Sequence, residues 1–152
     1  MSAIEKKESL EKEIGHLEEE ARMILPGIQA LFGFQLIAIF NQRFSELNRD
    51  TQTLHFIALL SSALSVLLVL TPAAYHRQAQ PGRISQNLCK VGTICLTASL
   101  LPLCIGMALD IYVIGELLKY AETTSSVLGA LTFAALLCAW FIFPRLMRKT
   151  MS

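Results

Sequence analysis

The feature that most constrains the fold is an uncharged stretch near the amino terminus, LPGIQALFGFQLIAIFNQRF at residues 25–44. It has no charged side chain from Pro26 to Phe40, and about 20 mostly apolar helical residues cross a bilayer core of about 30 Å. The stretch therefore predicts the first of four membrane-spanning helices. It also contains Gln29 and Gln35, whose amides are costly in hydrocarbon unless they find hydrogen-bond partners. We expect one side of this helix to face protein or water, with the other helices packed around it.

The composition supports a membrane domain along most of the chain. Of the 152 residues, 53% are hydrophobic and only 16% are charged, whereas about a quarter are charged in a typical soluble domain. The predicted fold is all-α: a bundle of four transmembrane helices behind an amino-terminal amphipathic helix. The predicted spans are about 25–43, 54–75, 88–111 and 126–143. The predicted domains are a cytoplasmic helix at 1–24, the transmembrane domain at 25–146 and a cytoplasmic tail at 147–152.

The amino-terminal segment, residues 2–24, is highly charged. Seven glutamates stand against four basic residues, so its net charge is about −3. Apolar residues recur every third or fourth position, which predicts a helix with one apolar face. Two interpretations remain open: a helix lying on the membrane surface or on neighbouring loops, or a short coiled coil that gathers subunits. We expect Pro26-Gly27 to mark a bend or restart where the chain enters the membrane.

The distribution of lysine and arginine predicts the topology, because cytoplasmic loops are enriched in both. Ten of the 13 basic residues fall in the amino-terminal segment, the loop between spans two and three, and the carboxy-terminal tail. These ten are Lys6, Lys7, Lys12, Arg22, Arg77, Arg83, Lys90, Arg145, Arg148 and Lys149. We therefore expect both termini and the middle loop to be cytoplasmic.

Small and helix-breaking residues predict how the spans pack. In the second span, hydroxyl groups can bond back to their own helix or let a neighbouring helix approach closely; they are Ser61, Ser62 and Ser65. In the fourth span, small side chains four residues apart predict a packing seam; they are Ala130, Ala134 and Cys138. Pro102 falls in the middle of the third span and predicts a kink.

No pattern in the sequence indicates enzymatic chemistry. Phosphate-binding loops, dinucleotide fingerprints, nucleophile elbows and HExxH motifs are absent. The three histidines fall in different segments, and the four cysteines lie in apolar runs without CxxC spacing. We expect no enzyme activity, no cofactor, no metal site and no nucleic-acid partner.

Polar residues inside the spans are the candidates for an ion path: Gln29, Gln35, Gln42 and Asp110. The sequence allows Gln35 either to line a narrow hydrated path in an oligomer or to hydrogen-bond between helices. Asp110 falls about 23 residues after Leu88, near the outer headgroups. It is a candidate to bind a proton or cation, and a salt bridge with Arg43 is the alternative.

Two further groups of charged residues flank the spans. An outward-facing cluster around Asp110 is predicted to contain Arg43, Glu46, His55 and Glu116. At the cytoplasmic face the candidates are Tyr75, His76 and Arg77. A histidine beside an arginine could sense internal pH; otherwise the group is an interfacial aromatic with cations that reach the headgroups.

Two motifs carry a family resemblance: LPGIQALFGFQL at residues 25–36 and PAAYHR at residues 72–77. The chain resembles a family of small bacterial four-pass membrane proteins of unknown function, some of which carry a sodium:proton antiporter label. The resemblance covers roughly residues 20–146. It implies a set of family-defining positions, namely Leu25, Pro26, Gly27, Gln29, Gly33, Phe34, Gln35 and the PAAYHR group.

The predicted function is that of an integral protein of the bacterial inner membrane. The first hypothesis is a homo-oligomeric channel or transporter-like protein for small cations or protons, because a single four-helix bundle has little room for a pore. The second is a non-transporting scaffold or accessory subunit that binds a protein partner through a stripe on its amino-terminal helix, formed by Leu10, Ile14 and Leu17. Membrane lipids are the other expected partners.

Overall fold

A computed structural model describes residues 3–79, 81 and 85–150, with side chains from Glu8 onward in these ranges. The side chains of Lys6, Lys7 and Arg83, which were counted among the cytoplasmic cations, lie outside the described residues. So do the last two residues of the predicted tail.

Helices account for 91% of the chain, and no strand occurs among the described residues, which confirms the all-α prediction. Four of the helices are long and apolar enough to cross a membrane. The elements are α1 (Ala3–Ala38), α2 (Gln42–Ser45), α3 (Arg49–Ala79), α4 (Gln86–Leu117), α5 (Glu122–Leu137), the π-helix η1 (Cys138–Ile142) and α6 (Phe143–Thr150).

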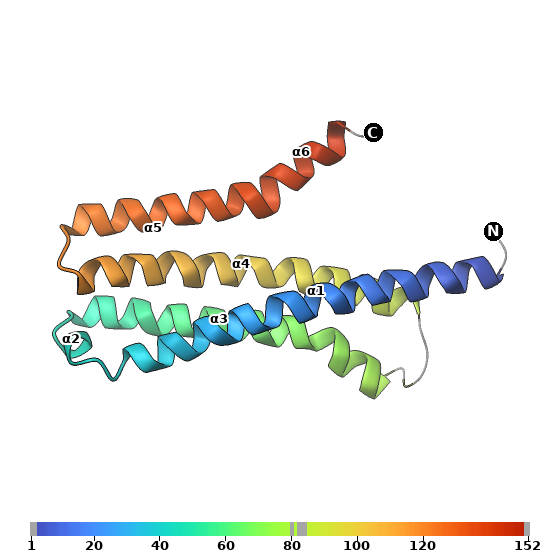
Figure 1. Ribbon diagram of the computed structural model, residues 1–152, viewed down its shortest axis with the longest axis horizontal. Coiled ribbons are helices and arrows are strands. Elements are labelled where there is room, and N and C mark those ends of the chain that lie inside the picture. The colour runs from blue at the N-terminus through green and yellow to red at the C-terminus, as the bar shows by residue number, and fades with distance from the viewer. Residues whose placement is uncertain (1–2, 80, 82–84, 151–152) are drawn as a thin grey trace.

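The long helices run alternately up and down (Figure 1). Both termini and the α3–α4 connection lie at one end of the molecule, here called the terminal end; α2 and the α4–α5 turn lie at the opposite end, the α2 end. Helices α1, α3 and α4 pack against one another, whereas α5 packs along α4. In the most apolar window of each span, 39% of the α4 residues are buried but only 6% of those in Glu122–Thr150, the stretch that comprises α5, η1 and α6. The bundle is therefore a three-helix core with α5 as a flanking helix.

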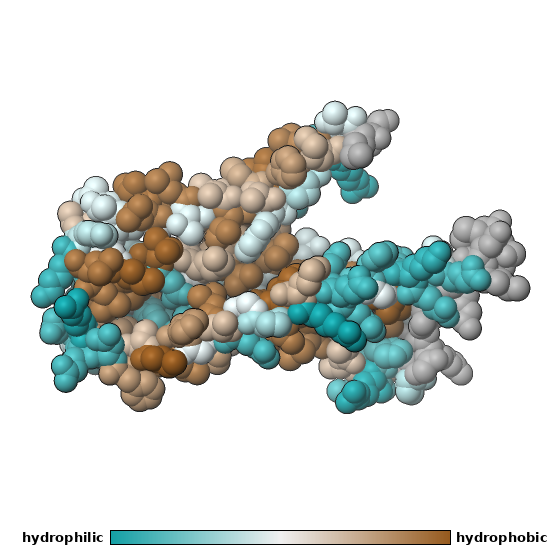
Figure 2. Space-filling view, in the orientation of Figure 1, coloured by the Kyte–Doolittle hydropathy of each residue, from teal (hydrophilic) through white to brown (hydrophobic). Residues whose placement is uncertain are grey.

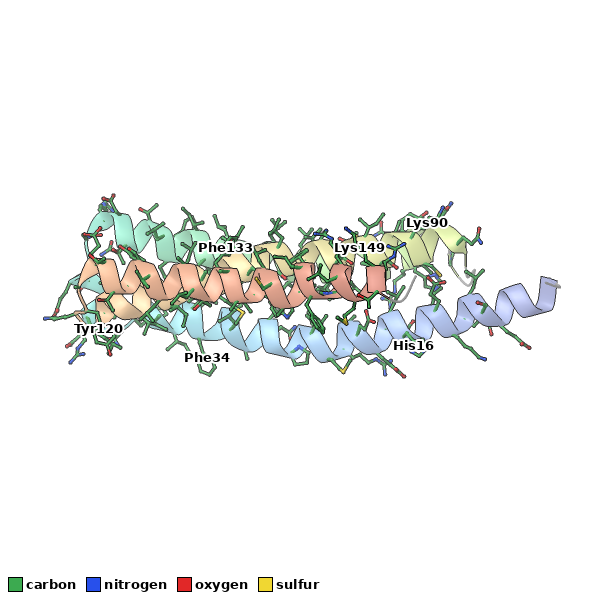
Figure 3. All side chains as sticks on the ribbon, turned by 90° about the horizontal axis from the view of Figure 1, so that it is seen from above. His16, Phe34, Lys90, Tyr120, Phe133 and Lys149 are labelled. Carbon is green, nitrogen blue, oxygen red and sulfur yellow. The ribbon has the colours of Figure 1, made fainter. Side chains whose placement is uncertain are left out.

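The outer surface of the long helices is apolar. Figure 2 shows hydrophobic residues over the middle of the molecule and hydrophilic ones gathered toward both ends. Phe34 is 72% exposed and points away from the neighbouring helices in Figure 3, and Met23 and Phe40 are similarly exposed. Such a surface suits lipid, because lipid tails are as apolar as these side chains.

Helix α1 does not restart at Pro26. It continues through this residue, so the predicted boundary at residue 24 lies inside one helix. Proline removes one backbone hydrogen bond, to the carbonyl of Arg22. Arg22 is exposed, so that carbonyl has access to other donors at the surface. The helices also extend beyond the predicted spans, and α6 runs to Thr150, through the described part of the predicted tail.

The α3–α4 contact follows the predicted serines. Ser61 donates a hydrogen bond to the Ile57 carbonyl in its own helix, whereas Ser65 donates across to the Ser99 carbonyl of α4 at 2.8 Å. Ser62 lies at a close approach of the two helices, because a Cβ added at Gly106 would come within 3.2 Å of its hydroxyl oxygen. Both roles proposed for these hydroxyls are confirmed.

The packing seam on α5 is not the predicted one. Ala130, Ala134 and Cys138 are exposed, and the buried residues of α5 are Ser125 and Gly129. A Cβ added at Gly115 of α4 would lie 2.6 Å from the Ser125 hydroxyl. The seam is fixed by this glycine on α4, which the spacing within α5 alone does not reveal.

Helix α5 ends in a π-turn whose cause is Pro144. The Phe143 amide donates to the Cys138 carbonyl, five residues back. Pro144 has no amide hydrogen and its ring crowds the carbonyl four residues earlier, so widening the preceding turn relieves the clash. The turn contains the sole tryptophan, Trp140, which packs against the core residues.

Candidate functional site

Three polar side chains from three helices meet near the α2 end. Gln35 lies in the last turn of α1, His55 in the second turn of α3, and Asp110 two turns before the end of α4. The helices alternate in direction, so the end of α1, the start of α3 and the end of α4 all lie at the α2 end (Figure 1). Gln35 is 3% exposed and His55 is 4% exposed. We call these three residues the polar cluster.

The polar cluster is held by short contacts. Gln35 Nε2 donates a hydrogen bond to Asp110 Oδ2 at 2.7 Å. His55 Nε2 lies 2.9 Å from the backbone carbonyl of Gln35, and His55 Nδ1 lies 3.8 Å from Asp110 Oδ1. Each residue therefore contacts both of the others, and the cluster ties the three core helices together.

The geometry limits where protons can reside. A carbonyl oxygen only accepts hydrogen bonds, so His55 Nε2 carries a hydrogen. His55 Nδ1 then faces Asp110 Oδ1 and has no hydrogen-bond partner. A carboxylate oxygen facing a bare ring nitrogen is repulsive, whereas one proton on either atom makes the contact attractive. The His55–Asp110 couple therefore offers two facing atoms, 3.8 Å apart, that a single proton would draw together.

The backbone around His55 is also fixed. The Phe44 ring packs edge-on against the imidazole at 5.1 Å between ring centroids. The Asn48 side chain caps α3 by accepting from the Thr51 amide at 2.7 Å. Gln52 donates to the carbonyls of Phe44 and Leu47. These contacts join α2 to the first turn of α3 and position the imidazole against α1.

Beside the polar cluster lies a polar pocket of about 340 Å³ at the α2 end. Its charged lining residues are Arg43, Glu46, Glu116 and Lys119. Glu116 Oε1 is buried without a hydrogen-bond partner, and Lys119 lies 3.8 Å from Glu46. Among the described residues no ion pair joins Arg43 to Asp110.

The structure therefore divides the predicted outward cluster in two. His55 joins Asp110 as expected, while Arg43, Glu46 and Glu116 line the neighbouring pocket. Gln35, predicted as an ion-path residue, is the partner of Asp110.

The remaining candidates lie elsewhere. Gln29 and Gln42 are exposed. Tyr75 is half-buried, and His76 and Arg77 line a second, largely apolar cavity of about 300 Å³ at the terminal end. Within the described residues, no group of three histidine, cysteine or acidic side chains could hold a metal ion.

Two features were missed by the sequence reasoning. The apolar cavity is formed by α1, α3 and α4 together, and its only sequence signal is the apolar stripe of α1. Lys119 adopts a left-handed backbone with φ of 60°. It ends α4 with a Schellman motif, in which the Lys119 amide donates to Glu116 and the Tyr120 amide to Gly115. Glycine is usual at such a position, so the lysine gave no signal.

Four long apolar helices with an apolar outer surface define an all-helical membrane protein. The chain belongs to a family of unknown function, DUF6328, whose model matches residues 5–144. Neither the curated proteins nor the solved structures gave a match. The predicted membership of an uncharacterised family is confirmed, while the bacterial source and the antiporter label stay predictions.

Proposed function

We propose that this protein is a homo-oligomeric, channel- or transporter-like membrane protein that moves protons or small cations. The observation that carries the proposal is the His55–Asp110 couple, two ionisable groups in contact inside apolar helices. Ionisable groups within a membrane domain are costly and commonly mark ion pathways or proton relays. Here one proton between Nδ1 and Oδ1 is the species that the site would bind and release.

The proposal gives each part of the polar cluster a task. Asp110 and His55 exchange the proton, and Gln35 holds the carboxylate through its amide. The polar pocket at the α2 end is lined by Glu116 and Arg43, and it would form the outer part of a route toward the cluster. The exposed apolar face of α5 leaves room for a second subunit, whose presence would complete a path.

The proposed setting is a bacterial inner membrane with both termini in the cytoplasm. Basic residues at the terminal end support this orientation: Lys12, Lys90 and Lys149 lie on segments that reach this end. The acidic residues of α1 before Met23 would concentrate cations there. We further propose that this part of α1 acts as an amphipathic cytoplasmic helix.

A non-transporting scaffold is the second candidate function. It needs the Leu10, Ile14 and Leu17 stripe to bind another protein. Leu17 packs against the core residues, and Ile14 lines the cavity shared with α3 and α4. Much of the stripe therefore already faces this chain's own helices.

The test is flux into liposomes that contain the purified protein and a pH-sensitive dye, under imposed proton, sodium and potassium gradients. We expect flux with the wild type, and a loss of about tenfold or more with Asp110→Asn, because the couple can no longer exchange its proton. Gln35→Leu should also reduce flux. Gln29→Leu, the same change at an exposed position of the same helix, should not.

No flux above that of empty liposomes from folded protein would reject transport and favour the scaffold. An equal loss of flux in Gln29→Leu and Gln35→Leu would show that the polar cluster is not the ion-binding site.

A further inference from the structure

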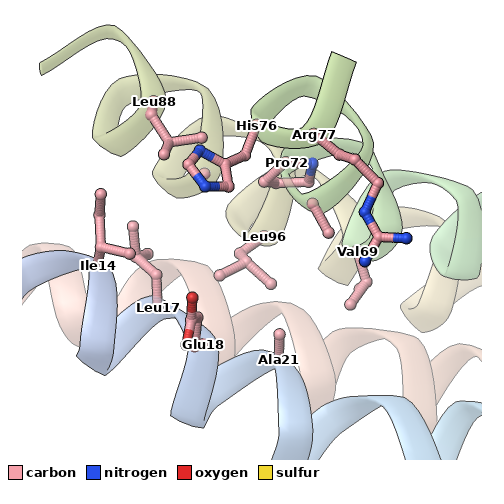
Figure 4. A pocket seen from close by; sticks show the side chains of 12 residues that line it. Ile14, Leu17, Glu18, Ala21, Val69, Pro72, His76, Arg77, Leu88 and Leu96 are labelled. Atoms are coloured by element: carbon pink, nitrogen blue, oxygen red, sulfur yellow. The ribbon is translucent and has the colours of Figure 1, made fainter. Parts of the chain in front are cut away.

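The cavity at the terminal end has the form of a small-molecule site. It lies between α1, α3 and α4 (Figure 4), and its volume of about 300 Å³ falls at the lower end of the range for ligand pockets. Leu17, Val69 and Leu96 form much of its apolar wall. Such a chamber suits a hydrocarbon chain.

Charged side chains of opposite sign lie on opposite walls of this cavity. His76 and Arg77 come from the last turn of α3, and Glu18 comes from α1. Figure 4 shows the Glu18 carboxylate on the α1 wall, facing the α3 side chains across the cavity. In the part of the chain that the structure describes, no ion pair joins Glu18 to either of these basic side chains. His76 Nδ1 is buried without a hydrogen-bond partner.

A ligand for this cavity must therefore be apolar at one end and carry both charges at the other. Arginine binds phosphate oxygens in a bidentate manner, and a carboxylate accepts hydrogen bonds from a primary ammonium. The cavity also lies where the apolar run of α3 gives way to His76 and Arg77, and we expect lipid headgroups at this level. A membrane phospholipid satisfies all of these conditions.

We propose that the cavity binds one phosphatidylethanolamine molecule. An acyl chain occupies the apolar chamber, the phosphate contacts Arg77 and His76, and the ammonium contacts Glu18. The bound lipid would join α1 to α3 and α4 at the membrane surface. This inference is independent of ion transport.

The experiment is native mass spectrometry of the detergent-solubilised full-length protein, titrated with three lipids that have identical acyl chains. The lipids carry ethanolamine, glycerol or choline headgroups. We expect the wild type to bind the ethanolamine lipid about tenfold more tightly than the others, the ratio given by one additional charge-assisted hydrogen bond. Glu18→Gln should abolish this preference, because only the ammonium uses the carboxylate.

Two variants and one control test the location. Arg77→Gln should weaken the binding of all three lipids, since all of them contain phosphate. Ala73→Trp, at an exposed residue that lines the cavity, should block them by filling the chamber. Arg145→Gln removes an exposed cation of α6 outside the cavity lining and should bind as the wild type does.

Equal affinity for the three headgroups, or a preference for the glycerol lipid, would overturn the assignment. So would unchanged binding by Glu18→Gln or Ala73→Trp.

Discussion

Replacing Asp110 by asparagine and by leucine separates hydrogen bonding from charge in the polar cluster. Asparagine keeps the shape of aspartate: its oxygen can accept from Gln35 Nε2, and its amide can donate to His55 Nδ1. Leucine removes both contacts and leaves two polar groups buried without partners. The two variants therefore differ chiefly in whether the buried polar groups of the cluster keep hydrogen-bond partners.

The distances give the expected magnitudes. At 3.8 Å, a full ion pair would contribute about 4 kcal/mol of Coulomb attraction at an effective dielectric constant near 20, most of it offset by desolvation. Asp110→Asn should therefore change the free energy of unfolding by no more than about 1 kcal/mol. Asp110→Leu loses a hydrogen bond to a charged acceptor and strands His55, so we expect a loss of about 3–5 kcal/mol.

The assay is unfolding in mixed micelles with increasing SDS, followed by helical circular dichroism and by the fluorescence of Trp140. Ile111→Leu, at the next residue of α4, which is partly exposed, is the matched control. It should unfold at the same SDS content as the wild type. If Asp110→Leu were as stable as the wild type, the cluster would contribute nothing to packing. If Asp110→Asn lost as much stability as Asp110→Leu, then charge and not hydrogen bonding would dominate the contribution of Asp110 to stability.

Three backbone predictions use the same assay. Gly115→Ala should lower the stability of the protein by about 1–3 kcal/mol, because the new Cβ overlaps with Ser125 at the α4–α5 contact, and adding Ser125→Gly should restore most of that loss. The control Gly33→Ala, with nothing within 4 Å of the new Cβ, should not destabilise the protein. Additive effects of Gly115→Ala and Ser125→Gly would refute the overlap. Lys119→Gly should stabilise the protein by about 1 kcal/mol, because glycine adopts the left-handed conformation without strain; lower stability would show that the lysine side chain matters more than its backbone. Pro144→Ala should convert the π-turn to α-helix and thereby change the quenching of the sole tryptophan's fluorescence by brominated lipid. Unchanged quenching would count against Pro144 as the cause of the π-turn.

The sequence identified most members of the candidate site but not their arrangement. Spacing along one helix placed Asp110 near the end of its span and suggested His55 as a neighbour. It could not place Gln35 against Asp110, because that contact depends on how α1 rotates relative to α4. Arg43, the alternative partner, lies instead in the adjacent pocket, since α1 ends at Ala38 and the chain turns before α2 begins.

The same limit explains the α5 seam. A ridge of small residues marks a surface that can approach another helix closely, but the helix that does so must offer a matching gap. Gly115 provides that gap opposite Ser125, and the predicted ridge at Ala130 and Ala134 is exposed.

The sequence by itself determined the class of this protein: uncharged runs of span length exclude a soluble core and require helices, because backbone groups in hydrocarbon must bond within their own segment. Only the tertiary structure decided that α5 flanks a three-helix core, that Gln35, His55 and Asp110 share one buried cluster, and that α1 closes an apolar cavity over α3 and α4. These outcomes depend on helix rotation and contact between segments distant in the chain. Hydropathy does not encode these relations, since the apolar part of each long helix is apolar on nearly every side.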